Sequence, residues 1–375
     1  MRIGLLGAGR IGAFHAATLA AHPGVGELVI ADADLPRARQ VADAYGGGWT
    51  GFGTAAARQA SVRAVSVDAL FDSRPDAVVI ASATEAHPRL ITWAAGAGIP
   101  AFCEKPVARD LAGTVAALRA VEEAGAVLQI GFQRRFDPGY RAAREAVKAG
   151  RMGRLHTVRT VSSDAAPPPA AYIPLSGGLY RDCLIHDFDI LRWVTGREVT
   201  EVYAAGANVG EDFFRAAGDA DTAAALLTLE GGVLVTATAT RYHAAGYDVR
   251  MELAGTDDQF SVGSGPRTPL TSVEPDAPPL GSVAVPPLRW PGFLERFASA
   301  YRAELDVFLR VARGERPNPC EGREALRALL VAEACELSRR ERRPVTMAEA
   351  EAVARTYEGG LNGPSAVNGV NGVVA

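Results

Sequence analysis

The stretch Ile3-Gly4-Leu5-Leu6-Gly7-Ala8-Gly9-Arg10-Ile11-Gly12 gives the chain an apolar strand, a glycine-rich turn and the start of a helix. Glycines 7, 9 and 12 have the spacing of a dinucleotide-binding turn. The first permits the tight turn, the second lets a pyrophosphate approach the backbone, and the third lets helix and strand pack closely. The N–H groups of Arg10, Ile11 and Gly12 would then face the phosphates. Glycine turns are common, so a Rossmann-like fold that binds something else remains the alternative.

An acidic residue follows this turn at the expected distance. Asp32 stands 20 residues after Gly12, at the end of the apolar run Leu28–Ala31. A carboxylate there accepts hydrogen bonds from ribose hydroxyls and repels a 2′-phosphate, which favours NAD. Arg37 and Arg39 lie close enough in sequence to keep NADP as the second option.

Up to residue 131, short apolar runs alternate with helical patterns, which predicts βαβ units. We therefore expect a doubly wound parallel sheet, a Rossmann domain, over residues 1–131. Its strands are predicted at Ile3–Leu6, Leu28–Ala31, Ala77–Ala81, Ala101–Cys103 and Val127–Ile130, and its helices at Ile11–Ala21, Pro36–Tyr45, Pro88–Ala97 and Leu111–Ala124. Residues 46–64 are rich in Gly and Ala without a clear period, and we interpret them as a loop or an extra helix.

After residue 151 the apolar runs are rich in Val, Thr and Ala, which predicts a largely antiparallel sheet in an α+β domain over residues 132–350. Gly231-Gly232 is typical of a hairpin turn. The expected strands are Leu155–Val161, Val199–Ala205, Thr222–Leu229, Val233–Thr240 and Val249–Leu253, and the expected helices are Leu184–Val194, Phe293–Arg313 and Gly322–Arg339. Residues 167–169 and 275–291 are predicted loops, and residues 359–375 a disordered tail.

Composition narrows the class of protein. The chain has 375 residues and a formal net charge of −4, and no Lys/Arg run stands out, which argues against a nucleic-acid or membrane partner. Four cysteines without a CxxC pair indicate reduced thiols and not a zinc site. No apolar run approaches the roughly 18 residues that span a membrane, and no signal peptide is evident, so we expect a cytoplasmic protein.

A lysine stands where ligands lie in doubly wound sheets. Glu104-Lys105-Pro106 follows an apolar strand at its carboxyl end. The proline would hold Lys105 in an extended conformation. Taken alone, the segment is equally compatible with a surface loop.

A second polar cluster is Asp182-Cys183-Leu184-Ile185-His186, preceded by Gly177-Gly178. Residues four apart share one face of a helix, so Asp182 and His186 could act together. The alternative is an ordinary helix with an acidic first turn and a satisfied histidine. Asp187 and Asp189 could suggest a metal site, but one turn supplies too few donors, and we predict no metal.

These motifs together resemble the Gfo/Idh/MocA oxidoreductase family. The glycine turn, Thr84-Glu85-Ala86-His87, Glu104-Lys105-Pro106 and Asp182-x-x-x-His186 occur in the family's order from residue 1 to about 347. Within the family the chain looks most like inositol 2-dehydrogenases, through Gly131-Phe132-Gln133-Arg134-Arg135-Phe136-Asp137-Pro138-Gly139-Tyr140 and Gly246-Tyr247-Asp248.

The resemblance implies a Rossmann domain followed by a large, open-faced, mainly antiparallel sheet, assembled into a homo-oligomer, a tetramer or a dimer. It implies a catalytic triad of Lys105, Asp182 and His186. It also places Arg134 and Tyr247 beside the substrate. Thr84, His87, Glu104 and Lys105 would join the glycine turn in the NAD site.

The chemistry expected of these residues is oxidation of a secondary hydroxyl of a cyclitol or sugar, foremost myo-inositol to 2-keto-myo-inositol (scyllo-inosose). His186 would take the hydroxyl proton, and Lys105 would stabilise the alkoxide-like oxygen. Asp182 would either orient the imidazole and stabilise its charged form or accept a neighbouring hydroxyl. Ser162, Asp164 and Asp189 are candidate partners for further hydroxyls. A ketosugar reductase, an NAD-dependent glycosidase and a non-catalytic redox sensor are the alternatives.

Overall fold

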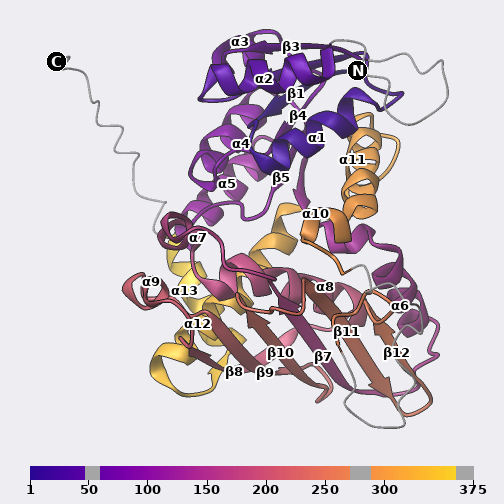
Figure 1. The fold of residues 1–375 in the computed structure, drawn as a ribbon, viewed down its shortest axis with the longest axis vertical. Coiled ribbons are helices and arrows are strands. Elements are labelled where there is room, and N and C mark those ends of the chain that lie inside the picture. The colour runs from indigo at the N-terminus through magenta and orange to yellow at the C-terminus, as the bar shows by residue number, and fades with distance from the viewer. Residues whose placement is uncertain (47–59, 271–288, 360–375) are drawn as a thin grey trace.

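The computed structural model describes residues 1–46, 60–270 and 289–359, and it contains two β-sheets with helices packed around them (Figure 1). The predicted disordered tail, most of the 46–64 segment and most of the 275–291 loop lie outside the described residues. Among the described helices, none is both long enough and apolar enough to cross a bilayer.

The first sheet has six strands in the order β3-β2-β1-β4-β5-β6, and every registered pair is parallel. This is the strand order of a Rossmann fold, so the predicted fold class is confirmed. The strands are β1 (Arg2–Leu6), β2 (Glu27–Ala31), β3 (Ser61–Val65), β4 (Ala77–Ile80), β5 (Ala101–Glu104) and β6 (Leu128–Gly131). The helices are α1 (Arg10–Ala20), α2 (Leu35–Gly46), α3 (Val67–Asp72), α4 (His87–Gly96) and α5 (Leu111–Glu123).

Strand β3 corrects the interpretation of residues 46–64 as a loop or extra helix. Ser61–Val65 pairs with β2 at the edge of the sheet. Its residues are only partly buried, and Ser61 and Arg63 interrupt the apolar run. An edge strand with one wet side does not carry the continuous apolar signal of the inner strands, so its pattern was missed.

The second sheet has seven strands in the order β12-β11-β7-β10-β9-β8-β13. Strands β7 and β10 are parallel, and the other registered pairs are antiparallel. Gly231 and Gly232, both at φ +80°, turn the chain between β9 and β10 as predicted. The strands are β7 (Leu155–Ser163), β8 (Val199–Ala207), β9 (Thr222–Leu229), β10 (Leu234–Thr240), β11 (Asp248–Gly255), β12 (Gln259–Val262) and β13 (Val345–Thr346).

One face of the second sheet is covered, and the other is open in the monomer. Along β10, Val235, Ala237 and Ala239 are buried, whereas Leu234 and Thr236 are exposed. The covering helices include α6 (Pro138–Lys148), α8 (Ile185–Thr195) and α12 (Gly322–Glu341), which lie above the sheet in Figure 1. The further helical elements of this half are η2 (Gln133–Phe136), η3 (Ala170–Tyr172), α7 (Ile173–Ser176), the π-helix η4 (Tyr180–Leu184), α9 (Asp212–Ala216) and α13 (Met347–Gly359).

A late segment of the chain returns to the first sheet. The predicted helix Phe293–Arg313 is split at Phe297 into α10 (Phe293–Arg296) and α11 (Ala298–Ala312). Leu305, Phe308 and Leu309 of α11 join the buried cluster that contains Ile3 and Phe102 of the Rossmann sheet. In space, α11 therefore belongs to the first core, although the predicted boundary at residue 131 assigned it to the second domain.

Candidate functional site

The glycine turn is shaped by close backbone packing. Gly7 has φ +109°, and a Cβ there would lie 2.4 Å from the carbonyl oxygen of Ala81. A Cβ on Gly12 would lie 2.0 Å from the Gly7 oxygen, so neither position admits a side chain. A Cβ on Gly9 would meet no described protein atom within 4 Å. Gly9 thus borders open space at the N-terminus of α1, which fits a dinucleotide pyrophosphate.

The Asp32 carboxylate is fixed at the end of β2. Oδ2 accepts from the Ala8 N–H at 2.7 Å, and Oδ1 accepts from the Asp34 N–H at 2.8 Å. Arg37 lies 3.9 Å from Asp32 and 3.2 Å from Asp34, so two carboxylates neutralise the nearest arginine. This arrangement suits ribose hydroxyls better than a 2′-phosphate.

Lys105 emerges from the end of β5 on a turn that His87 braces. The Lys105–Pro106 peptide is cis. The ring nitrogens of His87 lie 2.7 Å from the Pro106 carbonyl oxygen and 3.1 Å from the Ser82 carbonyl oxygen. Burial lowers the pKa of His87. A neutral imidazole has one N–H, so His87, predicted as a cofactor residue, donates to one of these two carbonyl oxygens and braces this turn near the end of β4, where Thr84 begins η1 (Thr84–Ala86).

Lys105, which follows β5 of the first sheet, contacts Asp182 in η4 of the second half of the chain. Lys105 Nζ donates to the Asp182 carbonyl oxygen at 2.8 Å and to Oδ1 at 3.2 Å. Tyr172 donates to the same Oδ1 at 3.0 Å, and Arg241 Nη2 lies 2.6 Å from Oδ2. Burial acts to raise the pKa of the Asp182 carboxyl, but Lys105 and Arg241 together lower it to about 2. Asp182 is therefore a permanent anion.

His186 does not contact the Asp182 carboxylate, although the four-residue spacing predicted that the two would act together. Asp182 lies in the π-helix Tyr180–Leu184, and α8 begins only at Ile185, so the two residues do not share one regular helical face. His186 Nδ1 is buried without a hydrogen-bond partner among the described residues. The imidazole packs edge-on against Phe132, with ring centroids 5.9 Å apart. Burial lowers the pKa of His186 well below its usual value, and Lys105 and Arg134 lower it further.

Arg134 and Ser162 form a buried triangle with Asp187 beside His186. Arg134 donates to Asp187 at 2.9 Å and to Ser162 Oγ at 3.0 Å. Ser162 Oγ donates to the second Asp187 oxygen at 2.6 Å. Asp187 was not among the predicted site residues; it forms an ion pair with Arg134, whose charge still lowers the His186 pKa.

Asp189 is placed away from this cluster, which does not fit its predicted contact with substrate. Its carboxylate is fully buried and accepts from Arg135 Nε at 2.9 Å, and Arg135 also pairs with Glu324 of α12 at 3.0 Å. Two residues after Asp187, the turn of α8 places this side chain in the packing against Arg135. Tyr247 does lie near Arg134 and Asp164, and burial raises its pKa.

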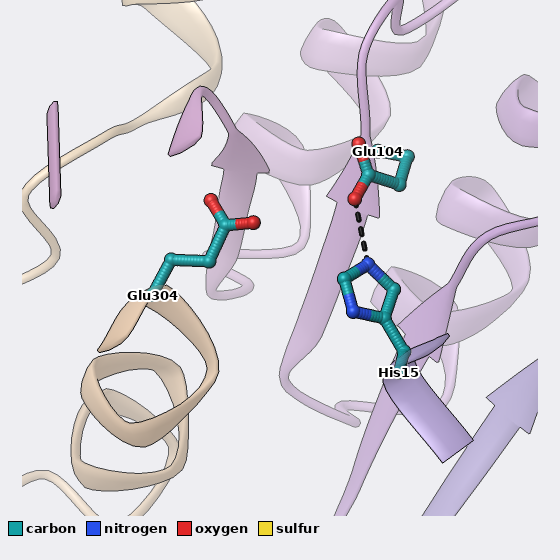
Figure 2. Close-up of side chains that lie close together, drawn as sticks. All are labelled: His15, Glu104 and Glu304. Atoms are coloured by element: carbon teal, nitrogen blue, oxygen red, sulfur yellow. Dashed lines mark hydrogen bonds and ion pairs between the residues drawn. The ribbon is translucent and has the colours of Figure 1, made fainter. Parts of the chain in front are cut away.

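Glu104 also points away from the expected ligand side. Its Oε1 forms a hydrogen bond with His15 Nε2 of α1 at 2.7 Å, and Glu304 of α11 faces the pair (Figure 2). Ligand atoms of the three residues lie within 4.8 Å of one another, the one such grouping among the described residues. Both Glu304 oxygens are buried without a partner in that part of the chain, and burial, with Glu104, raises the pKa of Glu304 well above its usual value. Burial favours the protonated form of Glu304, which carries no charge to attract a cation.

Comparison with known proteins gives the family. Residues 1–132 match the oxidoreductase family with an NAD-binding Rossmann fold, and residues 140–261 match the GFO/IDH/MocA C-terminal domain. The chain belongs to the Gfo/Idh/MocA family. As a family member with this nucleotide domain, it is an NAD-dependent dehydrogenase.

Relatives of this Gfo/Idh/MocA protein are similar over nearly their whole length. It is 38% identical to the myo-inositol dehydrogenase Hyg17 of Streptomyces leeuwenhoekii, over 89% of this chain and 96% of that protein. A myo-inositol dehydrogenase structure from Corynebacterium glutamicum superposes with a TM-score of 0.79 at 34% identity, covering 92% and 98% of the two chains. A scyllo-inositol dehydrogenase from Lactobacillus casei with bound NAD(H) and scyllo-inositol gives 0.77 at 27% identity, covering 93% and 99%.

Sequence reasoning missed Arg241, Tyr172 and Asp187 in this family member. Arg241 carried a usable signal, because it continues the alternation of buried residues along β10 and so lies on the covered face. A charged side chain at such a position needs a buried partner. Tyr172 lies in a proline-rich loop without periodicity, and no comparable signal marks it.

Proposed function

We propose that this dehydrogenase oxidises a secondary hydroxyl of a cyclitol with NAD, and that myo-inositol, converted to 2-keto-myo-inositol, is its substrate. The observation that carries the proposal is the ammonium of Lys105 held on an anionic Asp182 near an uncharged His186, where the carboxyl end of β5 meets η4 and α8. Relatives named as inositol dehydrogenases over most of the chain support the substrate class.

His186 is the proposed base. An alcohol gives up hydride only if its hydroxyl proton also leaves, so a proton acceptor must lie at the reacting carbon. Burial, Lys105 and Arg134 keep the imidazole neutral at physiological pH, which makes it able to accept that proton. With Nδ1 enclosed in the protein, Nε2 is the nitrogen that would meet the hydroxyl.

Lys105 is proposed to donate to the reacting oxygen. The oxygen becomes alkoxide-like as its proton leaves, and a fixed ammonium stabilises that charge. Asp182 holds the ammonium in place, which replaces the earlier expectation that Asp182 orients the histidine. Bound NAD supplies the hydride acceptor.

The remaining hydroxyls of a cyclitol need polar partners in place of water. Asp164 and Tyr247 are the proposed contacts, since Asp164 shares Arg241 with Asp182 and Tyr247 lies near Arg134 and Asp164. Arg134 and Ser162 are already bonded to Asp187 and would contribute mainly through the positive charge of the arginine.

A spectrophotometric screen tests the proposal. Purified protein is incubated with NAD or NADP and with myo-inositol, scyllo-inositol, other cyclitols or aldoses, while reduced nicotinamide is followed at 340 nm. We expect net NADH formation with myo-inositol, and a kcat/KM for NAD above that for NADP.

Other outcomes separate the alternatives. Activity confined to ketosugar with NADH would indicate a reductase. Release of an aglycone without net NADH would indicate a glycosidase. No turnover with any cyclitol in either direction would contradict the proposed substrate class.

A further inference from the structure

Arg241 is the charged residue that the site contains and the mechanism above does not use. It directly follows β10, which runs parallel to β7 with Thr240 opposite Ser163. Arg241 and Asp164 therefore lie side by side, each directly after the carboxyl end of its strand. Backbone bonds hold both residues, from Asp164 N to the Thr240 oxygen at 2.9 Å and from Arg241 N to the Asp221 oxygen at 2.8 Å.

The Arg241 guanidinium spans two carboxylates from different elements. Nη1 lies 3.0 Å from Asp164 Oδ2, and Nη2 lies 2.6 Å from Asp182 Oδ2. The arginine side chain is 4% exposed. A planar fork can bond two acceptors at once from a fixed position, which an ammonium on a flexible stem cannot do.

The charges around this fork balance. Two cations, Lys105 and Arg241, face two anions, Asp182 and Asp164. The neutral donor Tyr172 lies 3.0 Å from Asp182 Oδ1, and the neutral donor Cys183 lies 3.8 Å from Asp164 Oδ2. Both Asp182 oxygens are thereby engaged. A carboxylate held on both sides cannot rotate towards His186, and the Lys105 ammonium gains an anchor of fixed direction.

We propose that Arg241 is a positioning residue: it holds Asp182 in the orientation that fixes Lys105 for donation to the reacting oxygen. The assignment rests on the proposed function, because the direction of Lys105 matters only if it meets that oxygen. Arg241 itself need not touch substrate or cofactor.

The assignment has a consequence for pH dependence. Asp182 is faced by Lys105 from the end of β5, by Tyr172 from η3 and by Arg241, and only the first and last carry charge. Without Arg241, burial would raise the Asp182 pKa, and the carboxylate would protonate as pH falls through that raised value. Arg241 is not among the groups that lower the pKa of His186, so the titration of the histidine should stay where it is.

The test compares Arg241→Met, Arg241→Lys and the control Arg310→Met, an exposed α11 arginine paired with Asp306. For Arg241→Met we expect kcat to fall about tenfold or more at pH 8, NAD affinity by calorimetry to stay within about threefold, and the acid limb of kcat to move up by about a pH unit. Arg241→Lys keeps the charge, so its acid limb should stay near wild type while kcat falls. Arg310→Met should match wild type throughout.

An acid limb and kcat of Arg241→Met equal to wild type would overturn the proposal, as would a fully active Arg241→Lys. If Arg241→Met does not fold, Arg241→Lys alone decides through its kcat. If wild type oxidises no cyclitol, the proposed function fails, and crystal structures still test the positioning. In the Arg241→Met structure, the Asp182 carboxylate should no longer contact Lys105 Nζ. An unchanged Lys105–Asp182 pair would refute the positioning role of Arg241.

Discussion

At the scale of single residues, the site separates two roles that one triad is expected to share. Asp182 is bonded to Lys105, Tyr172 and Arg241, whereas His186 has a buried ring nitrogen without a partner in the described chain. The Asp182 carboxylate therefore fixes the position of Lys105, and His186 is held by packing against Phe132.

Removing the side chain of His186 or of Lys105 should slow turnover strongly without preventing NAD binding. We expect His186→Ala and Lys105→Ala each to lower kcat by about two decades or more, because general acid–base action contributes about 10²–10⁴-fold. Steady-state kinetics measures the loss, and calorimetry with NAD should show binding close to wild type. Near wild-type turnover in either variant would contradict the proposed roles.

Sequence reasoning identified the residue types at this scale better than their partners. Lys105 and Asp182 lie together as their motifs implied, with Lys105 directly after β5 and Asp182 in the π-helix η4. The direction of Asp182 could not be predicted, since it depends on a π-turn and on Arg241 from a distant strand. Asp189 was misplaced for a related reason: two residues along a helix change the face, and only packing shows which face meets the site.

At the scale of elements, three segments meet at one buried acidic cluster. Glu304 connects α11 to His15 of α1 and Glu104 of β5, which is the strand that carries Lys105 (Figure 2). Glu304 is fully buried, and burial raises its pKa well above the usual value, which favours its protonated form in the folded protein.

The free energy of unfolding should therefore depend on pH through Glu304. Below the ordinary carboxyl pKa, Glu304 is protonated both folded and unfolded. As pH rises, only the unfolded chain releases the proton, so the free energy of unfolding falls by about 1.4 kcal/mol per pH unit until the folded pKa is reached. Glu304→Gln lacks this loss. Denaturant unfolding from pH 5 to pH 8 should show its stability relative to wild type rising with pH.

Glu145→Gln, an exposed change on α6, is the control and should follow the wild-type curve at every pH. Parallel curves for Glu304→Gln and wild type would mean that Glu304 is ionised in the folded protein.

The inner strands and long helices were predictable because buried runs and 3.6-residue periods are strong signals. The edge strand β3 and the break at Phe297 were not. Both depend on tertiary surroundings: β3 on pairing with β2, and the break on the return of α11 to the first sheet.

At the scale of the whole molecule, the open face of the second sheet exposes large apolar side chains. Tyr203 of β8 stands opposite Leu226 of β9 and is 44% exposed, Leu226 is 47% exposed, and Leu234 of β10 is 49% exposed. An apolar sheet face of this kind is commonly covered by another subunit. We therefore propose that it joins copies of this chain into the expected homo-oligomer.

Leu226→Glu should break that association, because a charge buried in a subunit interface without a partner is strongly unfavourable. Light scattering after size exclusion should give a mass that is a multiple of the protomer for wild type and a smaller one for Leu226→Glu. Val353→Glu, on exposed α13, should leave the mass unchanged. A monomeric wild type would rule the proposal out.

The return of α11 to the first sheet also bears on the order in which the protein is made. A ribosome releases the six Rossmann strands long before it reaches Leu305, Phe308 and Leu309, which fill part of their core. During that interval the nascent N-terminal half leaves Ile3 and Phe102 without these partners, a surface on which a chaperone could bind. Completion of the nucleotide-binding half during synthesis thus waits for α11, which the chain reaches only after β12.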